Sequence, residues 1–315
     1  MRRVLDWRDA EPSLVAACYE REASYWRNTL DWDTATTWPV IEEARRAGGL
    51  AGFIVADGSN VRGWTFLHRS GDAIFIGALV ADDERATGQL VDAIDCCASK
   101  RRATITVGLI PDRAAAAERA LSAAGFETEP YLYLSRPLTR SVRLQPDLRE
   151  LSLRPWSPSD FVEAVALLRS SYDRTAALAF SPTGSGEEWV TYLEGLLDRD
   201  GCGVFDPVAS RVARDERGLC GLVLTSQIST DTLHIAQLAV RPDARRRGIA
   251  AGLLHDALAH AAAAGLRQAT LLVGQRNDRA RLLYERVGFR GGCAFLAARR
   301  REKPGKIFLR NGQVA

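Results

Sequence analysis

The sequence lacks any long uninterrupted apolar stretch. The 315-residue chain is 46% hydrophobic, yet no apolar run approaches the roughly 18 residues that a membrane-spanning helix needs. The first residues read MRRVLDWRDAEPS and place charges where a secretory signal requires apolar side chains. We therefore expect a cytoplasmic protein with no membrane partner.

Clusters of metal-binding residues are also missing. The four histidines form no HExxH motif, and the six cysteines form no CxxC pair. This pattern predicts no bound metal. The formal net charge is only +3, so charge gives no reason to expect a nucleic-acid partner.

Similar segments recur in the same order in the two halves of the chain. Segment 74–94 aligns with segment 234–254 at an offset of 160 residues, and the dipeptide Gly-Phe recurs at positions 125 and 288. A single match of this kind arises by chance, but an ordered set at similar offsets indicates duplication. We expect two copies of one domain.

The domain boundary is expected between these copies. Segment 136–150, RPLTRSVRLQPDLRE, has two prolines, alternating charges and no helical stripe, which is typical of an exposed linker. We therefore expect one domain over residues 1–140 and a second over residues 150–315.

The second copy alternates strand and helix patterns. The pattern predicts strands at 151–155, 208–214, 219–227, 232–240, 269–274 and 293–299, and helices at 160–171, 187–198, 248–264 and 278–287. Strands mixed with helices in this way predict an α/β fold, built as an α+β mixed sheet.

The strongest local signal is the segment QLAVRPDARRRGIAAGLL, which joins a strand ending at Val240 to a helix. The first turn of a helix has N–H groups without intrahelical partners and the positive end of the helix dipole. Small residues at Gly248 and Ala250 let an anion approach this backbone, and the three arginines before Gly248 attract it. We expect a diphosphate site; the alternative is an ordinary turn with solvated arginines.

Two motifs resemble those of the GCN5-related N-acetyltransferases, the GNAT family. RRRGIA at 245–250 resembles the family's [Q/R]xxGx[G/A] acetyl-CoA loop, and NDRARLLYERVGF at 277–289 resembles its second signature. The resemblance implies two tandem GNAT-like acyl-CoA N-acyltransferase domains, each with a mixed sheet splayed at its centre. It also implies acetyl-CoA as the acetyl donor, direct attack by the primary amine of a small molecule, and no metal.

The resemblance further implies which residues hold the coenzyme. Backbone amides of the loop would bind the pyrophosphate, and the strand before the loop would pair with pantetheine. The coenzyme-binding residues implied are Leu238, Val240, Arg245, Arg246, Arg247, Gly248, Ile249, Ala250, Ala251 and Asn277.

Four residues of the second motif share one helix face, because Asn277, Ala280, Tyr284 and Val287 are spaced i, i+3, i+7 and i+10. The resemblance makes Tyr284 the general acid that protonates the departing thiolate. The alternative is a half-buried packing tyrosine. Asn277 is either a helix N-cap or a residue near the coenzyme.

The general base is harder to place. Many members of the family use Glu or Asp at positions that correspond here to Ala236 and Gln237, neither of which is a base. His234 lies on the same predicted strand, and regular alternation puts its side chain on the face of Ala236 and Leu238. His234 is therefore either a catalytic base acting through water or a structural histidine.

The first copy lacks several of these features. Leu90 stands at the position of Ala250, where its side chain would obstruct an anion, and Leu121 stands at the position of Tyr284. Acidic residues at 82–84 would repel a diphosphate. We expect the first copy to have a degraded or absent acetyl-CoA site.

Aromatic residues concentrate near the start of the chain. They are Tyr19, Tyr25, Trp26, Trp32 and Trp38. Such residues either line an acceptor groove or pack in the core and between domains.

Two other functions fit the same residues. One is acetyl transfer to an amine of a protein or peptide. The other is a non-catalytic acyl-CoA-binding sensor, which the missing acidic base favours.

Overall fold

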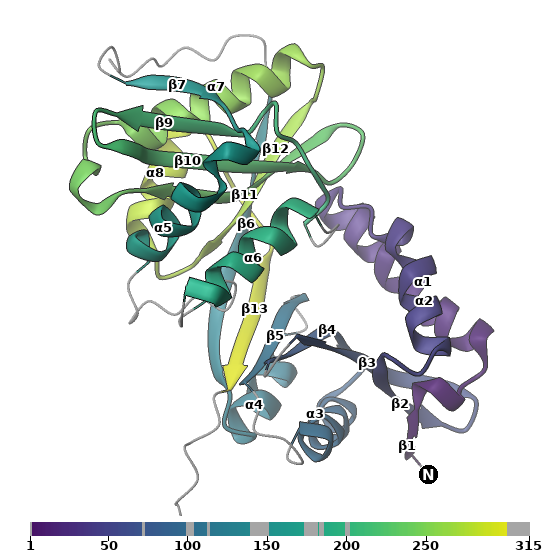
Figure 1. Ribbon diagram of the computed structural model, residues 1–315. Coiled ribbons are helices and arrows are strands. Elements are labelled where there is room, and N and C mark those ends of the chain that lie inside the picture. Colours follow the sequence, from purple (N-terminus) through teal and green to yellow (C-terminus); the bar gives the residue numbers. More distant parts are fainter. Residues whose placement is uncertain are drawn as a thin grey trace, which may run out of the picture. The chain divides into compact units, whose positions relative to one another are not determined.

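The computed structural model describes residues 2–70, 73–98, 104–111, 114–138, 151–172, 182, 186–198 and 202–300 (Figure 1). Its contacts divide the chain into two compact units, each built from separate segments of sequence. Unit 1 consists of Met1–Val15, Val40–Glu129 and Phe295–Ala315, and unit 2 consists of Ala16–Pro39 and Pro130–Ala294. Within the described ranges, no helix combines the length and the apolar character needed to cross a bilayer.

Unit 1 is a mixed sheet with helices on one face. Its strands, in sheet order, are β1 (Arg2–Asp6), β2 (Ala51–Asp57), β3 (Asn60–Ser70), β4 (Ala73–Ala81), β5 (Thr104–Pro111) and β13 (Ala294–Arg300). Strands β4 and β5 are parallel and the other pairs are antiparallel. Helices α3 (Glu84–Ala98) and α4 (Ala114–Ala123) bury Leu90, Ile94 and Leu121 against this sheet.

Aromatic rings occupy another part of unit 1. The short 3₁₀ turn η1 (Trp7–Asp9) stacks Trp7 on Phe66 at a centroid distance of 5.5 Å, and the Trp7 Nε1–H donates to the Leu50 carbonyl at 2.9 Å. A Cβ at Gly52 would lie 2.6 Å from the Trp7 ring, so only glycine permits this approach. Helix α2 (Trp38–Arg46) supplies Arg45, which donates to the Trp7 carbonyl at 2.8 Å.

Unit 2 contains a second mixed sheet. Its strands, in sheet order, are β7 (Ser152–Pro155), β9 (Arg211–Asp215), β10 (Gly218–Gln227), β11 (Thr232–Val240), β12 (Gln268–Gly274) and β6 (Glu127–Pro137), with β8 (Val204–Phe205) paired to β10. Its helical elements are α1 (Pro12–Leu30, from Ala16 onward), η2 (Ala35–Thr37), η3 (Pro158–Asp160), α5 (Phe161–Ser171), α6 (Gly186–Asp198), η4 (Pro242–Ala244), α7 (Ile249–Ala263) and α8 (Asp278–Val287).

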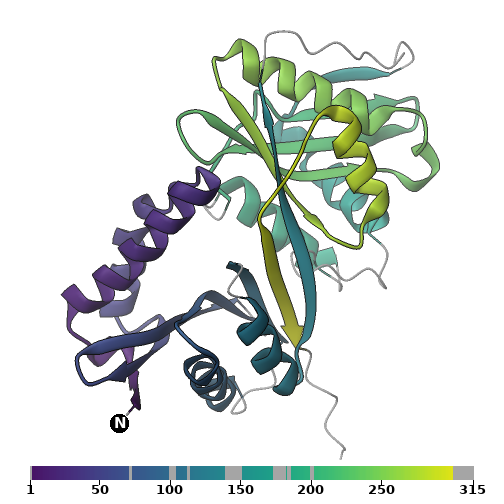
Figure 2. The same cartoon turned by 180° about the vertical axis from the view of Figure 1, so that it is seen from behind.

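Helices cover both faces of the unit 2 sheet. Helices α7 and α8 lie on one face (Figure 2), where Leu253, Leu254 and Leu258 are fully buried. Helices α5 and α6 lie on the other face (Figure 1), where Trp189 and Leu193 are buried. The apolar residues of α7 thus form one stripe that packs in the core. Mixed sheets layered with helices confirm the predicted α/β fold.

Most predicted elements of the second half are present with shifted ends. The strand predicted at 208–214 starts only at Arg211, because the Asp206 carboxylate accepts from the Val208 and Ala209 N–H groups and holds a turn there. A linker was expected at 136–150, but its first two residues belong to the end of strand β6. Residues 139–150 of that segment lie outside the described residues.

Each unit takes the last strand of its sheet from the other half of the sequence. In unit 1, β13 pairs antiparallel with β5 from Phe295 opposite Pro111 to Arg300 opposite Ile105. In unit 2, β6 pairs antiparallel with β12 over all seven residues of β12. The compact units therefore interleave the two halves, whereas the expectation above was two continuous domains. That 1–140 and 150–315 are copies of one ancestral domain remains a prediction.

This exchange predicts that the second half cannot fold alone. A chain of residues 150–315 would lack β6, the strand that hydrogen-bonds β12, and also the segment Ala16–Pro39. It would leave β12 as an open edge beside an exposed core. We expect this fragment to show no cooperative thermal unfolding by circular dichroism. A chain ending at Arg300 keeps every described residue and serves as the control. A fragment that unfolds cooperatively at the temperature of the full chain would contradict the prediction.

Candidate functional site

Strands β11 and β12 separate partway along the unit 2 sheet. They pair in parallel only from Thr232–Ile235 to Gln268–Leu271. Beyond this point β11 continues along β10 as far as Val240, while β12 continues along β6 as far as Gly274. The two strands form a fork in which the β11 backbone no longer bonds to β12. The fork agrees with the central splay that the resemblance implied.

A β-bulge lies at the base of this fork. In the pairing of β10 with β11, Leu224 is opposite Gln237 and Thr225 is opposite Ile235, so Ala236 is the extra residue. The bulge shifts the alternation of side chains. Leu238 packs in the core beneath α7, whereas Ala236 packs beneath α5 and α6. The expectation that Ala236 and Leu238 share one face is therefore wrong, because it assumed a regular strand.

The arginine-rich turn follows directly at the end of β11. After the 3₁₀ turn η4, Arg246 has φ +70° and Gly248 has φ +79°, and α7 begins at Ile249. The Gly248 conformation is one that glycine adopts without strain. The Gly252 N–H donates to the Gly248 carbonyl at 3.0 Å, so the amides of Ile249, Ala250 and Ala251 precede the first hydrogen bond within the helix. These amides lie without intrahelical partners at the positive end of the helix dipole, which is the kind of helix end that attracts anions.

The three arginines of the turn behave differently from one another. The Arg245 guanidinium turns back onto the fold, where it donates to the Val240 carbonyl at 3.2 Å and to the Ser171 carbonyl at 2.6 Å. Its role is to tie the turn to β11 and to the end of α5. Arg246 and Arg247 are exposed beside Gly248 and contribute positive charge at the start of α7.

The backbone at Leu238 and Val240 faces away from β10. The Leu238 N–H donates to the Gln237 side-chain oxygen at 3.1 Å, and the Val240 carbonyl accepts from the Ser171 hydroxyl at 3.2 Å. A strand whose backbone bonds to side chains rather than to a neighbouring strand has an open edge. An extended ligand can pair with that edge.

Two tyrosines meet Gln237 at the fork, and the sequence patterns did not place them there. Tyr172, just after α5, donates to the Gln237 side-chain oxygen, and the Gln237 amide nitrogen donates to the Tyr192 hydroxyl at 2.9 Å. Burial raises the pKa of Tyr172 and Tyr192 well above the ordinary value. The sequence held one signal that could have revealed such partners. Gln237 carries the carboxamide on a strand expected to be buried, and a buried carboxamide needs hydrogen-bond partners.

Tyr284 lies in the core between α8 and the sheet. It is 8% exposed, and its ring meets Phe289 edge-on at a centroid distance of 6.0 Å. Burial raises the pKa of Tyr284 to about 12, so its phenol is protonated at neutral pH. Repulsion from Tyr284 and Tyr131 also contributes to the raised pKa of Tyr172, which places these phenols near one another.

Asn277 caps α8. Its side-chain oxygen accepts from the Ala280 N–H at 3.2 Å, which is the N-cap geometry. The first of its two expected roles is therefore present. Its exposed position at the start of α8 leaves the second role as a proposal.

His234 is enclosed by aromatic rings within unit 2. It is 3% exposed, Trp32 lies 5.2 Å away and Tyr133 lies 6.2 Å away between ring centroids, and its Nδ1 is 3.0 Å from the Thr270 hydroxyl. Burial lowers the pKa of His234 to about 4, so the ring is neutral and binds a proton weakly at neutral pH. Of the two roles expected for His234, these surroundings favour the structural one.

The start of α3 in unit 1 occupies the place that corresponds to the arginine-rich turn. Only two residues separate β4 from α3, and the Asp83 carboxylate accepts from the Ala86 N–H at 2.9 Å while Arg2 pairs with it at 2.6 Å. A carboxylate thus caps the helix end. Leu90 is fully buried in the core rather than beside the helix end, so the expected obstruction by Leu90 is wrong. The cause is that α3 begins at Glu84, soon after β4 ends at Ala81, whereas α7 begins well after β11 ends. Leu90 therefore lies further along its helix than Ala250 does.

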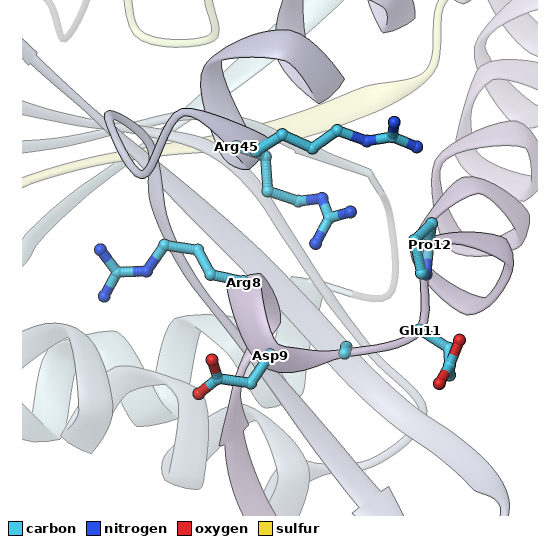
Figure 3. Close-up of a pocket in the computed structure, with 7 residues that line it drawn as sticks. Arg8, Asp9, Glu11, Pro12 and Arg45 are labelled. Atoms are coloured by element: carbon cyan, nitrogen blue, oxygen red, sulfur yellow. The ribbon is translucent and has the colours of Figure 1, made fainter.

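A separate hollow of about 370 Å³ lies in unit 1, lined by residues 8–12 together with Arg45 and Arg46 (Figure 3). Arg45 is 2% exposed, and its guanidinium is engaged by Glu42 at 2.7 Å. The Arg46 side chain also donates to Glu42, at 2.6 Å. Glu42 thus pairs with both arginines, and the acidic residues Asp9 and Glu11 also line the hollow, so the hollow is a poor anion site. Across the described parts of the chain, no three His, Cys, Asp or Glu side chains are arranged to hold a metal ion.

The model of the Acetyltransferase (GNAT) family matches residues 167–289. This range contains the fork, the arginine-rich turn and α8. No curated protein matches the sequence.

Solved structures with the same fold are similar over most of the chain. A GCN5-related N-acetyltransferase from Sphaerobacter thermophilus is 18% identical, with a TM-score of 0.69 over 96% of each chain. A tandem GNAT protein from the clavulanic acid biosynthesis pathway is 14% identical, with a TM-score of 0.53 over 81% of this chain and 83% of that one. A glucosamine N-acetyltransferase region of a fungal multi-domain β-N-acetylglucosaminidase is 15% identical, with a TM-score of 0.63 over 95% of this chain and 38% of that one.

The buried His234 makes stability depend on pH. Its pKa is about 4 in the folded protein and 6.5 when exposed, so the unfolded chain binds the extra proton between these values. His234 therefore lowers the free energy of unfolding by up to about 3 kcal/mol as the pH falls from 6.5 to 4. Urea unfolding at several pH values should show that His234→Gln flattens this dependence. An unchanged slope in the variant would contradict the assignment.

Proposed function

From the GNAT-family domain in the second half of the chain, we propose that this protein is an N-acetyltransferase that moves an acetyl group from acetyl-CoA to a primary amine of a small molecule. The observation that carries the proposal is the placement of the arginine-rich turn at the open end of the fork. One strand, β11, thus leads from an open backbone edge directly to an anion-binding helix end.

We propose that the two ends of the coenzyme use these two features. The amides of Ile249, Ala250 and Ala251 would hold the pyrophosphate, with Arg246 and Arg247 adding attraction. The open β11 edge at Leu238 and Val240 would pair with the pantetheine arm, as a peptide pairs with a sheet edge. The Leu238 N–H then lies where it can donate to the acyl carbonyl oxygen.

Acetyl-CoA, when bound, supplies a thioester carbonyl as the electrophile. The acceptor nitrogen forms a bond to that carbonyl carbon, the carbon–sulfur bond breaks, and the proton lost by nitrogen passes to water. Tyr284 is the proposed proton donor to the departing sulfur, because burial keeps its phenol protonated at neutral pH. The products are an acetamide and free CoA.

The first half is proposed not to bind the coenzyme. The Asp83 carboxylate occupies the amide-rich end of α3, and Leu121 holds the position of Tyr284. The way the two helices end supports the equivalence of Leu121 and Tyr284. The Phe126 N–H donates to the Leu121 carbonyl of α4 at 2.9 Å, and the Phe289 N–H donates to the Tyr284 carbonyl of α8 at the same distance.

The direct test is release of free CoA from acetyl-CoA in the presence of an amine panel, with glucosamine included because one structural neighbour is described as acting on it. We expect thiol release and an acetylated amine by mass spectrometry. Gly248→Trp should weaken acetyl-CoA binding at least tenfold, because its side chain covers the helix end. Gly265→Trp is the matched control, since Gly265 has φ +91° at the other end of α7 and shares the backbone strain.

Other outcomes of that test point elsewhere. Acetylation of peptides with no small-molecule product would favour a protein acceptor. Coenzyme binding without turnover of any amine would favour the sensor. Equal loss of binding in Gly248→Trp and Gly265→Trp would contradict the pyrophosphate assignment.

Tyr284→Phe tests the general acid. The ring keeps its contact with Phe289, while the hydroxyl that would protonate the thiolate is removed. We expect kcat to fall about 100-fold, because general acid catalysis contributes at least that much, with little change in the Kd for acetyl-CoA. An unchanged kcat would remove Tyr284 from the mechanism.

A further inference from the structure

Gln237 makes an unusual set of contacts for a strand residue. Its side-chain oxygen accepts from the N–H of the next residue, Leu238, at 3.1 Å and also from the Tyr172 hydroxyl. Its amide nitrogen donates to the Tyr192 hydroxyl at 2.9 Å. The residue is 7% exposed, so each polar atom of this carboxamide is satisfied inside the protein.

The bulge explains how the side chain reaches its own neighbouring amide. The extra residue Ala236 rotates the strand, so Gln237 projects toward α5 and α6. The Leu238 N–H points out of the sheet edge instead of pairing with β10. A carbonyl oxygen from Gln237 therefore fills the position in front of this N–H.

We propose that Gln237 acts as an internal substitute for the acyl carbonyl and controls access to the Leu238 amide. This inference rests on the proposed acyl-CoA site. A carboxamide oxygen and a thioester oxygen are the same kind of hydrogen-bond acceptor, so they compete for the one N–H. An acylated coenzyme must displace Gln237, whereas free CoA, which has no acyl carbonyl, leaves it in place.

Tyr172 and Tyr192 make this displacement reversible. Both hydroxyls remain neutral over the physiological range, because burial raises the pKa of each. When the carboxamide oxygen of Gln237 leaves Leu238, the Tyr172 hydroxyl still donates to that oxygen, and the Tyr192 hydroxyl still accepts from the amide nitrogen. Gln237 is thus a positioning residue that can rotate away and return without leaving a buried polar atom unpaired.

The test compares binding of acetyl-CoA with binding of CoA. A merely structural role of Gln237 would affect both Kd values alike and leave their ratio unchanged. Calorimetry on the full chain would measure the Kd for acetyl-CoA and for CoA in the wild type, in Gln237→Ala and in Gln227→Ala. Gln227 lies exposed at the end of β10 and is the matched control. We expect Gln237→Ala to increase the preference for acetyl-CoA over CoA by about two- to tenfold, the worth of one net hydrogen bond. Gln227→Ala should leave the ratio unchanged.

Tyr172→Phe provides a second variant that keeps the core filled. It removes the hydrogen bond that holds the Gln237 oxygen after this oxygen leaves Leu238, so displacement then leaves a buried oxygen unpaired. The preference for acetyl-CoA over CoA should therefore fall in Tyr172→Phe, and this variant decides the matter if Gln237→Ala does not fold. An unchanged or reduced preference in Gln237→Ala, or an unchanged or increased one in Tyr172→Phe, would overturn the proposal while leaving the proposed function intact. Failure of the wild type to bind either ligand would overturn both.

Discussion

The separation of β11 from β12 is the constraint on which the rest of unit 2 depends. Parallel strands normally satisfy one another's backbone groups along their whole length, and here that pairing stops after Ile235 and Leu271. The backbone beyond that point needs other partners. Side chains from Ser171 and Gln237 supply them, and the arginine-rich turn closes the open end. The proposed site would therefore take its ligand-binding groups from main chain that no neighbouring strand pairs.

The turn after β11 combines rigid and exposed parts. Arg241 pairs with Asp215 at 2.6 Å, and Arg245 reaches the carbonyls of Val240 and Ser171, so the base of the turn is fixed on three elements. Arg246 and Gly248 adopt positive φ and carry the chain into α7. A run of three arginines therefore divides into an anchor and two exposed charges. This division is a property of the folded backbone and does not follow from residue type.

Local sequence patterns predicted the α-helices and most strands of the second half of the chain because those elements depend on nearby residues. The α7 stripe and the Asn277 cap each depend on residues of a single helix. The bulge at Ala236 depends on register with β10, which no local pattern encodes. The partners of Gln237 and the contact of Trp32 with His234 join residues far apart in sequence. The sequence thus located the arginine-rich turn, while the groups that shape the fork required the tertiary structure.

The exchange of β6 and β13 has a consequence during protein synthesis. The ribosome makes β5 early and β13 only after every strand of unit 2, so one side of β5 waits for its partner through most of translation. An unpaired strand edge invites association with other chains. In unit 2, by contrast, strand β6 is synthesised before β7, the next strand of that sheet along the chain. The order of synthesis therefore favours completion of the proposed catalytic unit first, with unit 1 closing last and most exposed to aggregation in the interval.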